Sequence, residues 1–304
     1  MSKMNLKNVR SSRAEVPDRI LIMGTEGVGK STFAADSPDP IFLGAEDGLH
    51  HLDVQKFPEP ETFADVLESV NVLRNEDHDY KGFVIDTLDW LEPLVWDSLC
   101  KQNEWANIES PGYGKGYNIA TGEWRKLIAA IERLRAEKSM RVIFVAHTMI
   151  RNFANPVDED YMRYECKLHK GAAALVKEWC DVVLFASHEE FVRENTQGKK
   201  IKKAASTGRR VMHTVRTAAW DAKTRYSLPE ELDLSWEAYA EARAADVTAA
   251  PADLETEARG LLSELKTDNG KAEEIAAYID NNKTDAVALA KLVNRLKTKV
   301  MEAA

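Results

Sequence analysis

Short apolar runs alternate with segments of helical periodicity along the first part of the chain. Each run is apolar throughout, which is typical of strands that are covered on both faces of a parallel sheet. The segments between them, such as 62–74 and 124–137, gather their apolar residues on one helical face. This alternation predicts an α/β fold with a mostly parallel central sheet. The runs that we interpret as strands are 19–23, 40–45, 82–86, 141–146 and 181–186.

The pattern changes after Ala186. Residues 189–193 and 210–217 have the composition of paired strands around a polar turn, 195–208, so we expect an antiparallel hairpin that extends the sheet. Residues 244–252 form a low-complexity segment that we interpret as a linker. Three amphipathic helices are expected after it, the last one capped by Thr284, at 254–265, 271–279 and 284–300. These features predict an N-terminal arm, an α/β core, a linker and a C-terminal helical domain at 1–16, 17–243, 244–252 and 253–304.

Charge and composition narrow the class of protein. The chain has 304 residues, with 41 Lys and Arg against 50 Asp and Glu, and a formal net charge of -9. This balance excludes a polybasic protein that binds nucleic acid by bulk charge. No apolar run approaches the roughly 20 residues that span a bilayer, and the first residues are too polar for a secretory signal. We therefore expect a cytoplasmic protein without a membrane partner.

A phosphate-binding loop is the strongest motif. Gly24 to Ser31 reads Gly-Thr-Glu-Gly-Val-Gly-Lys-Ser, a complete G-x-x-x-x-G-K-S directly after a predicted strand. In such a loop, backbone N–H groups surround a phosphate, Lys30 reaches the β- and γ-phosphates, and the Ser31 hydroxyl binds Mg²⁺. The sequence therefore predicts a nucleoside triphosphate site formed by Gly24, Thr25, Glu26, Gly27, Val28, Gly29, Lys30, Ser31 and Thr32.

A carboxylate for the Mg²⁺ shell is expected at Asp86, the last residue of the third apolar run. Many ATPases place a water-activating Glu directly after this Asp, but here the next residue is Thr87. Either the general base comes from elsewhere or the protein only binds nucleotide. Glu46, at the end of the second run, is the favoured base, with Asp47 as its nearest rival. Asp89 is a weaker candidate, because it has the position of an acid that caps a helix.

His147 ends the fourth apolar run, at the same predicted edge of the sheet. Ligands of open α/β sheets bind at the carboxyl ends of the strands. A polar side chain in this position can sense the γ-phosphate, and the alternative is a structural histidine.

These residues resemble, in type and in order, the core of the RecA/RadA recombinases. The resemblance implies that Glu46 activates the attacking water and that Asp86-Thr87 ends the magnesium strand. It implies that His147 occupies the position of the γ-phosphate sensor, where the family usually has Gln. It also implies that Lys223 and Arg225 form a basic pair that enters the ATP site of a neighbouring subunit, unless they are ordinary surface cations.

A narrower resemblance is to phage-encoded RecA-core ATPases associated with single-strand annealing. It rests on Gly-Lys-Gly-Tyr at 114–117, on the strand that ends in Ala-His, and on Ala-Lys-x-Arg followed by Leu-Pro, and it covers residues 17–243. It implies ATP and Mg²⁺ as cofactors, single-stranded DNA as partner, and a ring or filament of identical subunits in the host cytoplasm. The implied function is annealing or strand exchange in phage recombination. A hexameric helicase-like motor and a nucleotide-switched loader with little turnover are the alternatives.

Local basic and aromatic segments are the candidates for DNA contact. Residues 195–220 contain seven basic side chains and no acid, although the alternative is a solvated hairpin tip. Two loops, 105–122 and 148–170, occupy the places that line the DNA channel in RecA-like proteins, and the first has rings that could stack on bases. The C-terminal helices could recruit a single-strand-binding protein. The candidate DNA-binding residues are Tyr113, Lys115, Tyr117, Arg151, Arg163, Lys167, Lys199, Lys200, Lys202, Lys203, Arg209 and Arg210.

Overall fold

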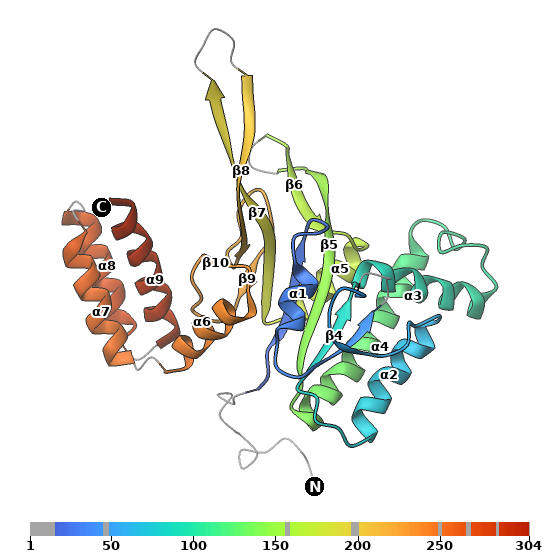
Figure 1. Cartoon of the computed structure of the whole chain (residues 1–304). Helices are drawn as coiled ribbons and strands as arrows, with labels where there is room; N and C mark the ends of the chain where they lie inside the picture. Colours follow the sequence, from blue (N-terminus) through green and yellow to red (C-terminus); the bar gives the residue numbers. More distant parts are fainter. Residues whose placement is uncertain are drawn as a thin grey trace.

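The computed structural model of the protein describes residues 16–44, 49–155, 159–195, 201–248, 251–265, 269–283 and 286–303. Within these ranges a single ten-stranded sheet runs through the middle of the core, in the order β10-β8-β7-β1-β5-β4-β2-β3, with β6 beside β5 and β9 beside β7 (Figure 1). The strands are β1 Arg19–Gly24, β2 Pro40–Gly44, β3 Gln55–Lys56, β4 Gly82–Asp86, β5 Arg141–Phe153, β6 Tyr161–Cys166, β7 Val182–Asn195, β8 Ile201–His213, β9 Lys223–Thr224 and β10 Glu231–Asp233.

The central strands β3, β2, β4, β5, β1 and β7 are parallel to their neighbours, whereas β6, β8, β9 and β10 pair antiparallel. Helices connect the parallel strands, as right-handed crossovers require. The predicted fold class, a mostly parallel α/β sheet with an added antiparallel hairpin and C-terminal helices, is confirmed. The helices are α1 Lys30–Ala35, α2 Phe63–Asn75, α3 Leu88–Asn103, α4 Lys115–Lys138, α5 Lys170–Trp179, α6 Trp236–Thr248, α7 Pro251–Glu264, α8 Asn269–Asn281 and α9 Ala286–Ala303.

Two apolar cores cover the two faces of the sheet. Successive residues of β1 point to opposite faces, so Leu21 belongs to one core and Ile22 to the other. The first core packs α2, α3, α4 and α5 against the sheet, and the second packs α1 and α6. Because both faces are covered, the apolar runs in the sequence are continuous, and the open positions of the sheet are the ends of its strands.

Several predicted boundaries differ from the structure. β7 runs to Asn195 and β8 from Ile201 to His213, so residues 201–208 of the predicted turn are strand, residues 214–217 of the predicted strand are not, and the hairpin extends past the rest of the sheet (Figure 1). The predicted loop 105–122 is partly helical: α4 begins at Lys115, about two and a half turns before the expected start at residue 124. The predicted loop 148–170 is largely a second hairpin, formed by the end of β5 and by β6. In both cases the polar composition that indicated a loop belongs to the exposed part of a regular element.

The segment 244–252, interpreted as a linker, is mostly helical. Residues 244–248 continue α6, and Pro251 begins α7 in the first-turn position that proline favours. The three predicted C-terminal helices are present as α7, α8 and α9 and share a small core of their own. The arm 1–15 and Thr284 lie outside the described residues. None of the described helices is long and apolar enough to cross a membrane.

Candidate nucleotide-binding site

The ends of the central strands bring the predicted site residues together. In the register of the sheet, Gly44 of β2 lies beside Asp86 of β4, and Gly24 of β1 lies beside His147 of β5. Ala186 of β7 is the neighbour of Gly24 on its other side. The phosphate loop, Asp86 and His147 therefore lie at one edge of the sheet, which we call the carboxyl edge. The strand ends share this edge as expected, and the roles predicted for these residues stay predictions.

The phosphate loop connects β1 with α1 and packs tightly against β7. A side chain at Gly24 would collide with the carbonyl oxygen of Ala186, and Gly29 has a φ of 110°, so the loop needs glycine at both positions. The Lys30 side chain is buried, and its Nζ donates to the carbonyl oxygens of Thr25 at 2.7 Å and Gly24 at 3.1 Å. The ammonium group thus bends over the loop, where a phosphate would also find it.

Hydroxyl and carboxylate oxygens suited to Mg²⁺ lie at the same edge of the sheet as the loop. Ser31 is in the first turn of α1, and Asp86, at the end of β4, is 2% exposed. Hard oxygen donors of this kind, together with phosphate oxygens and waters, are what Mg²⁺ prefers. Thr87 is also buried, and within the described part of the chain its hydroxyl has no hydrogen-bond partner. The residues present therefore fit a nucleotide with Mg²⁺.

An aspartate holds His147 in place. Asp89, in the first turn of α3, accepts a hydrogen bond from the backbone N–H of His147 at 2.9 Å, and its other oxygen lies 2.9 Å from Nδ1 of the same residue. Burial alone would raise the pKa of Asp89, but the hydrogen bonds from His147 outweigh it and keep this pKa below its ordinary value. With Nδ1 engaged, Nε2 is the imidazole nitrogen left for a ligand. Sequence reasoning treated Asp89 as a helix cap; its position three residues after the end of β4, close to the predicted site, was the signal that could have revealed this contact.

A second buried carboxylate lies one turn further along α3. Glu92 accepts the backbone N–H of His169, at 2.9 Å and 3.2 Å from its two oxygens, at the start of α5. Burial raises the pKa of Glu92 to about 7. The His169 ring stacks on the ring of Tyr117 with centroids 4.4 Å apart. Helix α3 thus contacts both His147 and the start of α5.

The predicted water-activating residues lie outside the described ranges. Glu46 and Asp47 follow Gly44, the last residue of β2, by two and three positions. Because Gly44 is the register partner of Asp86, the described part of the chain ends close to the magnesium carboxylate. The choice between the two acids stays a prediction.

The candidate DNA residues near the carboxyl edge divide into exposed and packed ones. Tyr113 and Lys115 are exposed, and so is Lys167, whose Nζ lies 3.8 Å from a carboxylate oxygen of Asp89. The Arg151 side chain is 40% exposed on the β5–β6 hairpin. These four stay candidates for nucleic-acid contact.

Tyr117 and Arg163 were candidates that the structure assigns to other contacts. The Tyr117 ring packs on His169, and its hydroxyl donates to Glu109 at 2.9 Å, so this ring is not free to stack on a base. Arg163 is 3% exposed, pairs with Asp221 and lies over the ring of Phe153. Their prediction as DNA contacts is therefore wrong for this conformation, because packing against partners distant in sequence cannot be read from the local pattern.

The basic segment 195–220 is not free of acids in space. Arg209 is surrounded by the carboxylates of Asp233, Glu231 and Glu189, at 2.7, 3.0 and 3.5 Å. The guanidinium group of Arg210 points to the phosphate loop instead, 3.5 Å from the carbonyl oxygen of Val28. Neither arginine is therefore a free cation at the surface. This corrects the expectation that both contact DNA. Lys202 and Lys203 are in β8, their side chains are not described, and Lys199 and Lys200 lie outside the described ranges.

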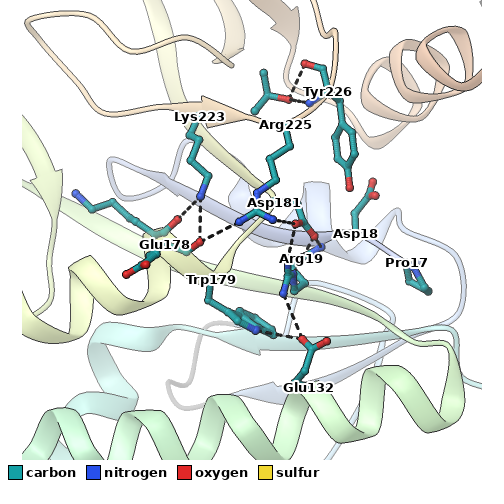
Figure 2. Close-up of polar contacts among 12 residues, drawn as sticks. Pro17, Asp18, Arg19, Glu132, Glu178, Trp179, Asp181, Lys223, Arg225 and Tyr226 are labelled. Atoms are coloured by element: carbon teal, nitrogen blue, oxygen red, sulfur yellow. Dashed lines mark hydrogen bonds and ion pairs between the residues drawn. The ribbon is translucent and has the colours of Figure 1, made fainter. Parts of the chain in front are cut away.

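The predicted intersubunit pair lies at the opposite edge of the sheet, which we call the amino edge (Figure 2). The Nζ of Lys223 donates to the carbonyl oxygens of Lys177 and Glu178 at the end of α5, at 2.7 and 3.2 Å. The Arg225 guanidinium lies 3.3 Å from Asp181, which also pairs with Arg19 at 2.6 Å. Both cations therefore stabilise the C-terminal end of a helix within their own chain. A role in a neighbour's site stays a prediction.

Comparison with known proteins identifies the family of the core. No curated protein matches the chain. Among solved structures, the crystal structure of the RadB recombinase matches with 11% identity and a TM-score of 0.36, covering 62% of this chain and 87% of that one. A likeness this distant says nothing about substrate or assembly. Residues 17–226, which include the phosphate loop, Asp86 and His147, match the AAA_24 family of AAA domains. The chain therefore belongs to this AAA-domain family.

Proposed function

We propose that the protein is an ATP- and Mg²⁺-dependent ATPase that binds single-stranded DNA, assembles with copies of itself, and promotes annealing or strand exchange. The P-loop AAA domains generally bind ATP with Mg²⁺. In this chain Lys30 would bind the phosphates, and Ser31 and Asp86 would hold the ion. The bound ion would neutralise the charge that develops on the phosphates.

The observation that carries the proposal is the position of His147. It is the last residue of β5 that pairs with β1, and Thr148, the next residue, is the first that pairs with β6. The side chain that faces the nucleotide site therefore lies at the base of the hairpin that presents Arg151. Asp89 fixes the imidazole in this place. A contact with the γ-phosphate would thus bear directly on the orientation of the hairpin that presents Arg151.

The exposed groups around this hairpin are suited to bind single-stranded DNA. Lys115, Arg151 and Lys167 can neutralise phosphates, and the fully exposed ring of Tyr113 can stack on a base. Salt screens charges that are farther apart than about one Debye length. The acidic residues elsewhere on the chain therefore weaken the attraction between these groups and the DNA only a little. Binding of this kind weakens as salt increases.

The assay that tests the proposal measures ATP hydrolysis without DNA, with single-stranded DNA and with duplex, each at low and high salt. We expect single strands to stimulate turnover more than duplex does, and the stimulation to fade with salt. The variant Lys30→Ala, with the same DNA, gives the background. Equal turnover with and without single strands at both salt concentrations would contradict the proposal.

A nucleotide-switched loader is a second candidate, and Thr87 favours it. The position beside Asp86 that often supplies the general base carries only a buried hydroxyl. A loader would bind ATP tightly and hydrolyse it negligibly, even with DNA, and could recruit a partner such as a single-strand-binding protein through α7–α9. The same assay, combined with a measurement of ATP affinity, separates the two candidates.

A further inference from the structure

A cavity of about 310 Å³ lies at the carboxyl edge, on the side of the phosphate loop opposite to His147. Its walls come from β6, β7, β8 and β10, from the segment before β9, and from Thr25 of the loop. It therefore opens at the base of both hairpins. Its volume is at the lower end of the range for small-molecule sites. The lining residues are Thr25, Tyr164, Phe185, Ser187, His188, Glu189, Val211, His213, Trp220 and Glu231.

Stacked aromatic rings form one wall of this cavity. The Trp220 ring lies flat on those of His213 and Phe185, with centroids 4.3 Å and 5.1 Å apart. Tyr164 contacts Phe185 from the other side, at 5.2 Å. The Trp220 Nε1 donates to the carbonyl oxygen of Val215 at 3.3 Å, which fixes the ring. Such a preordered platform suits a flat aromatic ligand.

Two carboxylates, Glu189 and Glu231, line the cavity beside hydroxyl and imidazole groups, and both carboxylates also contact Arg209. Ser187 Oγ lies 3.3 Å from Nε2 of His213, and a carboxylate oxygen of Glu231 lies 3.6 Å from Nδ1 of the same ring. Burial lowers the pKa of His213 despite the nearby Glu231, so the imidazole is neutral at neutral pH. Glu189 adds a second carboxylate to the lining. Carboxylates repel a phosphate and accept hydrogen bonds from an amino group.

We propose that this cavity binds one unpaired nucleobase with an exocyclic amino group, from a strand that passes between the two hairpins. This inference rests on the proposed binding of single-stranded DNA and names the part of the strand that is recognised. A nucleotide on the phosphate loop would contact residues 24–32, of which only Thr25 lines the cavity. The ring of the base would stack beside Trp220, and Glu231 would accept from its amino group.

The test compares labelled oligonucleotides of equal length by fluorescence anisotropy: oligo-dC, oligo-dT and an abasic strand. Wild-type protein should bind oligo-dC at least about 5-fold tighter than oligo-dT, because only cytosine has an amino group. Trp220→Leu should weaken binding of both base-bearing strands about 5-fold or more and leave the abasic strand unchanged. Glu231→Gln should remove most of the preference for oligo-dC. Glu237→Gln, on the exposed side of α6, is the matched control.

Two further measurements keep the outcomes separate. Calorimetric titration with ATP and with inorganic tripolyphosphate should show no effect of Trp220→Leu on either ligand. If Trp220→Leu weakens the binding of ATP but not of tripolyphosphate, the proposal is overturned, because the cavity would then bind the adenine base of ATP. Equal affinities of wild-type protein for base-bearing and abasic strands would overturn it while leaving strand binding intact. If no strand binds at all, the proposed function fails with it. Circular dichroism confirms folding of each variant, and Glu231→Gln decides if Trp220→Leu does not fold.

Discussion

The two edges of the central sheet use similar residue types in opposite ways. At the amino edge, three cations have partners within the chain: Arg19 and Arg225 share Asp181, and Lys223 donates to backbone carbonyls at the end of α5 (Figure 2). At the carboxyl edge, buried polar groups such as the Thr87 hydroxyl have no hydrogen-bond partner in the described ranges, and the Lys30 ammonium bends onto the carbonyls of its own loop. A buried polar group without a partner calls for an explanation, and a nucleotide bound at the carboxyl edge would supply one for Thr87. Four experiments test this comparison.

The largest effect is expected from the cation pair at the amino edge. If Lys223 and Arg225 complete a neighbour's site, the double variant Lys223→Ala/Arg225→Ala should lose about 10³-fold in ATP turnover. Its free energy of unfolding should fall by only about 1 kcal/mol, because the contacts to α5 are largely exposed. Mixing it with Lys30→Ala protein, which keeps both cations, should restore part of the turnover. Full activity of the double variant would confine the pair to its structural role.

Asp181 tests the structural role of the amino edge directly. Replacing it with alanine leaves the guanidinium of Arg19, whose side chain is 16% exposed, without its main partner. Breaking a pair this buried should reduce the free energy of unfolding by about 3–5 kcal/mol, measured by urea denaturation. The exposed pair Arg74–Glu137 supplies the control, since Glu137→Gln should cost less than about 1 kcal/mol. Similar costs for the two variants would contradict the assignment of Asp181.

Glu92 makes the stability of the carboxyl edge depend on pH. Burial raises its pKa from 4.5 to about 7, so the folded protein binds a proton that the unfolded chain has already released. Stability should therefore fall as the pH rises from about 4.5 to about 7 and stay level above, by at most about 3 kcal/mol. Urea denaturation across this range should show the decline in wild-type protein and a shallower one in Glu92→Gln. Parallel curves for the two proteins would exclude the titration of Glu92 as the cause.

The smallest effect is expected at Asp89. Asp89→Asn keeps the shape of the side chain but replaces an acceptor with a possible donor opposite Nδ1 of His147. ATP turnover should fall about 10- to 100-fold, while the affinity for ATP changes little. The double variant with His147→Ala should be no slower than His147→Ala alone, since Asp89 acts through the histidine. Additive losses would show that Asp89 has a separate role.

The sequence predicts the carboxyl edge well because strand ends are local features. The phosphate loop, Asp86 and His147 each follow a continuous apolar run, and parallel strands bring such ends to one edge. It predicts the partners of these residues poorly. That Asp89 holds His147, that Glu92 contacts the start of α5, and that Arg163 is buried against Asp221 all depend on packing between elements far apart in sequence.

The basic segment 195–220 also shows that sequence does not predict contacts between distant elements. An acid-free stretch of sequence predicts a positive surface only if no other strand adds acids to it. β8 pairs with β7 and β10, and these bring Glu189, Glu231 and Asp233 to Arg209. The pairing of strands decides the local charge. The composition of the basic segment does not show which strands pair with it.

One unbroken strand has a mechanical consequence. β5 runs from Arg141 to Phe153, first inside the parallel sheet and then in the hairpin with β6. The strand is continuous across His147, so the hairpin residues of β5 follow the direction that β5 has within the sheet. A small change in the tilt of β5 would therefore displace Phe153, at the far end of the strand, more than Thr148.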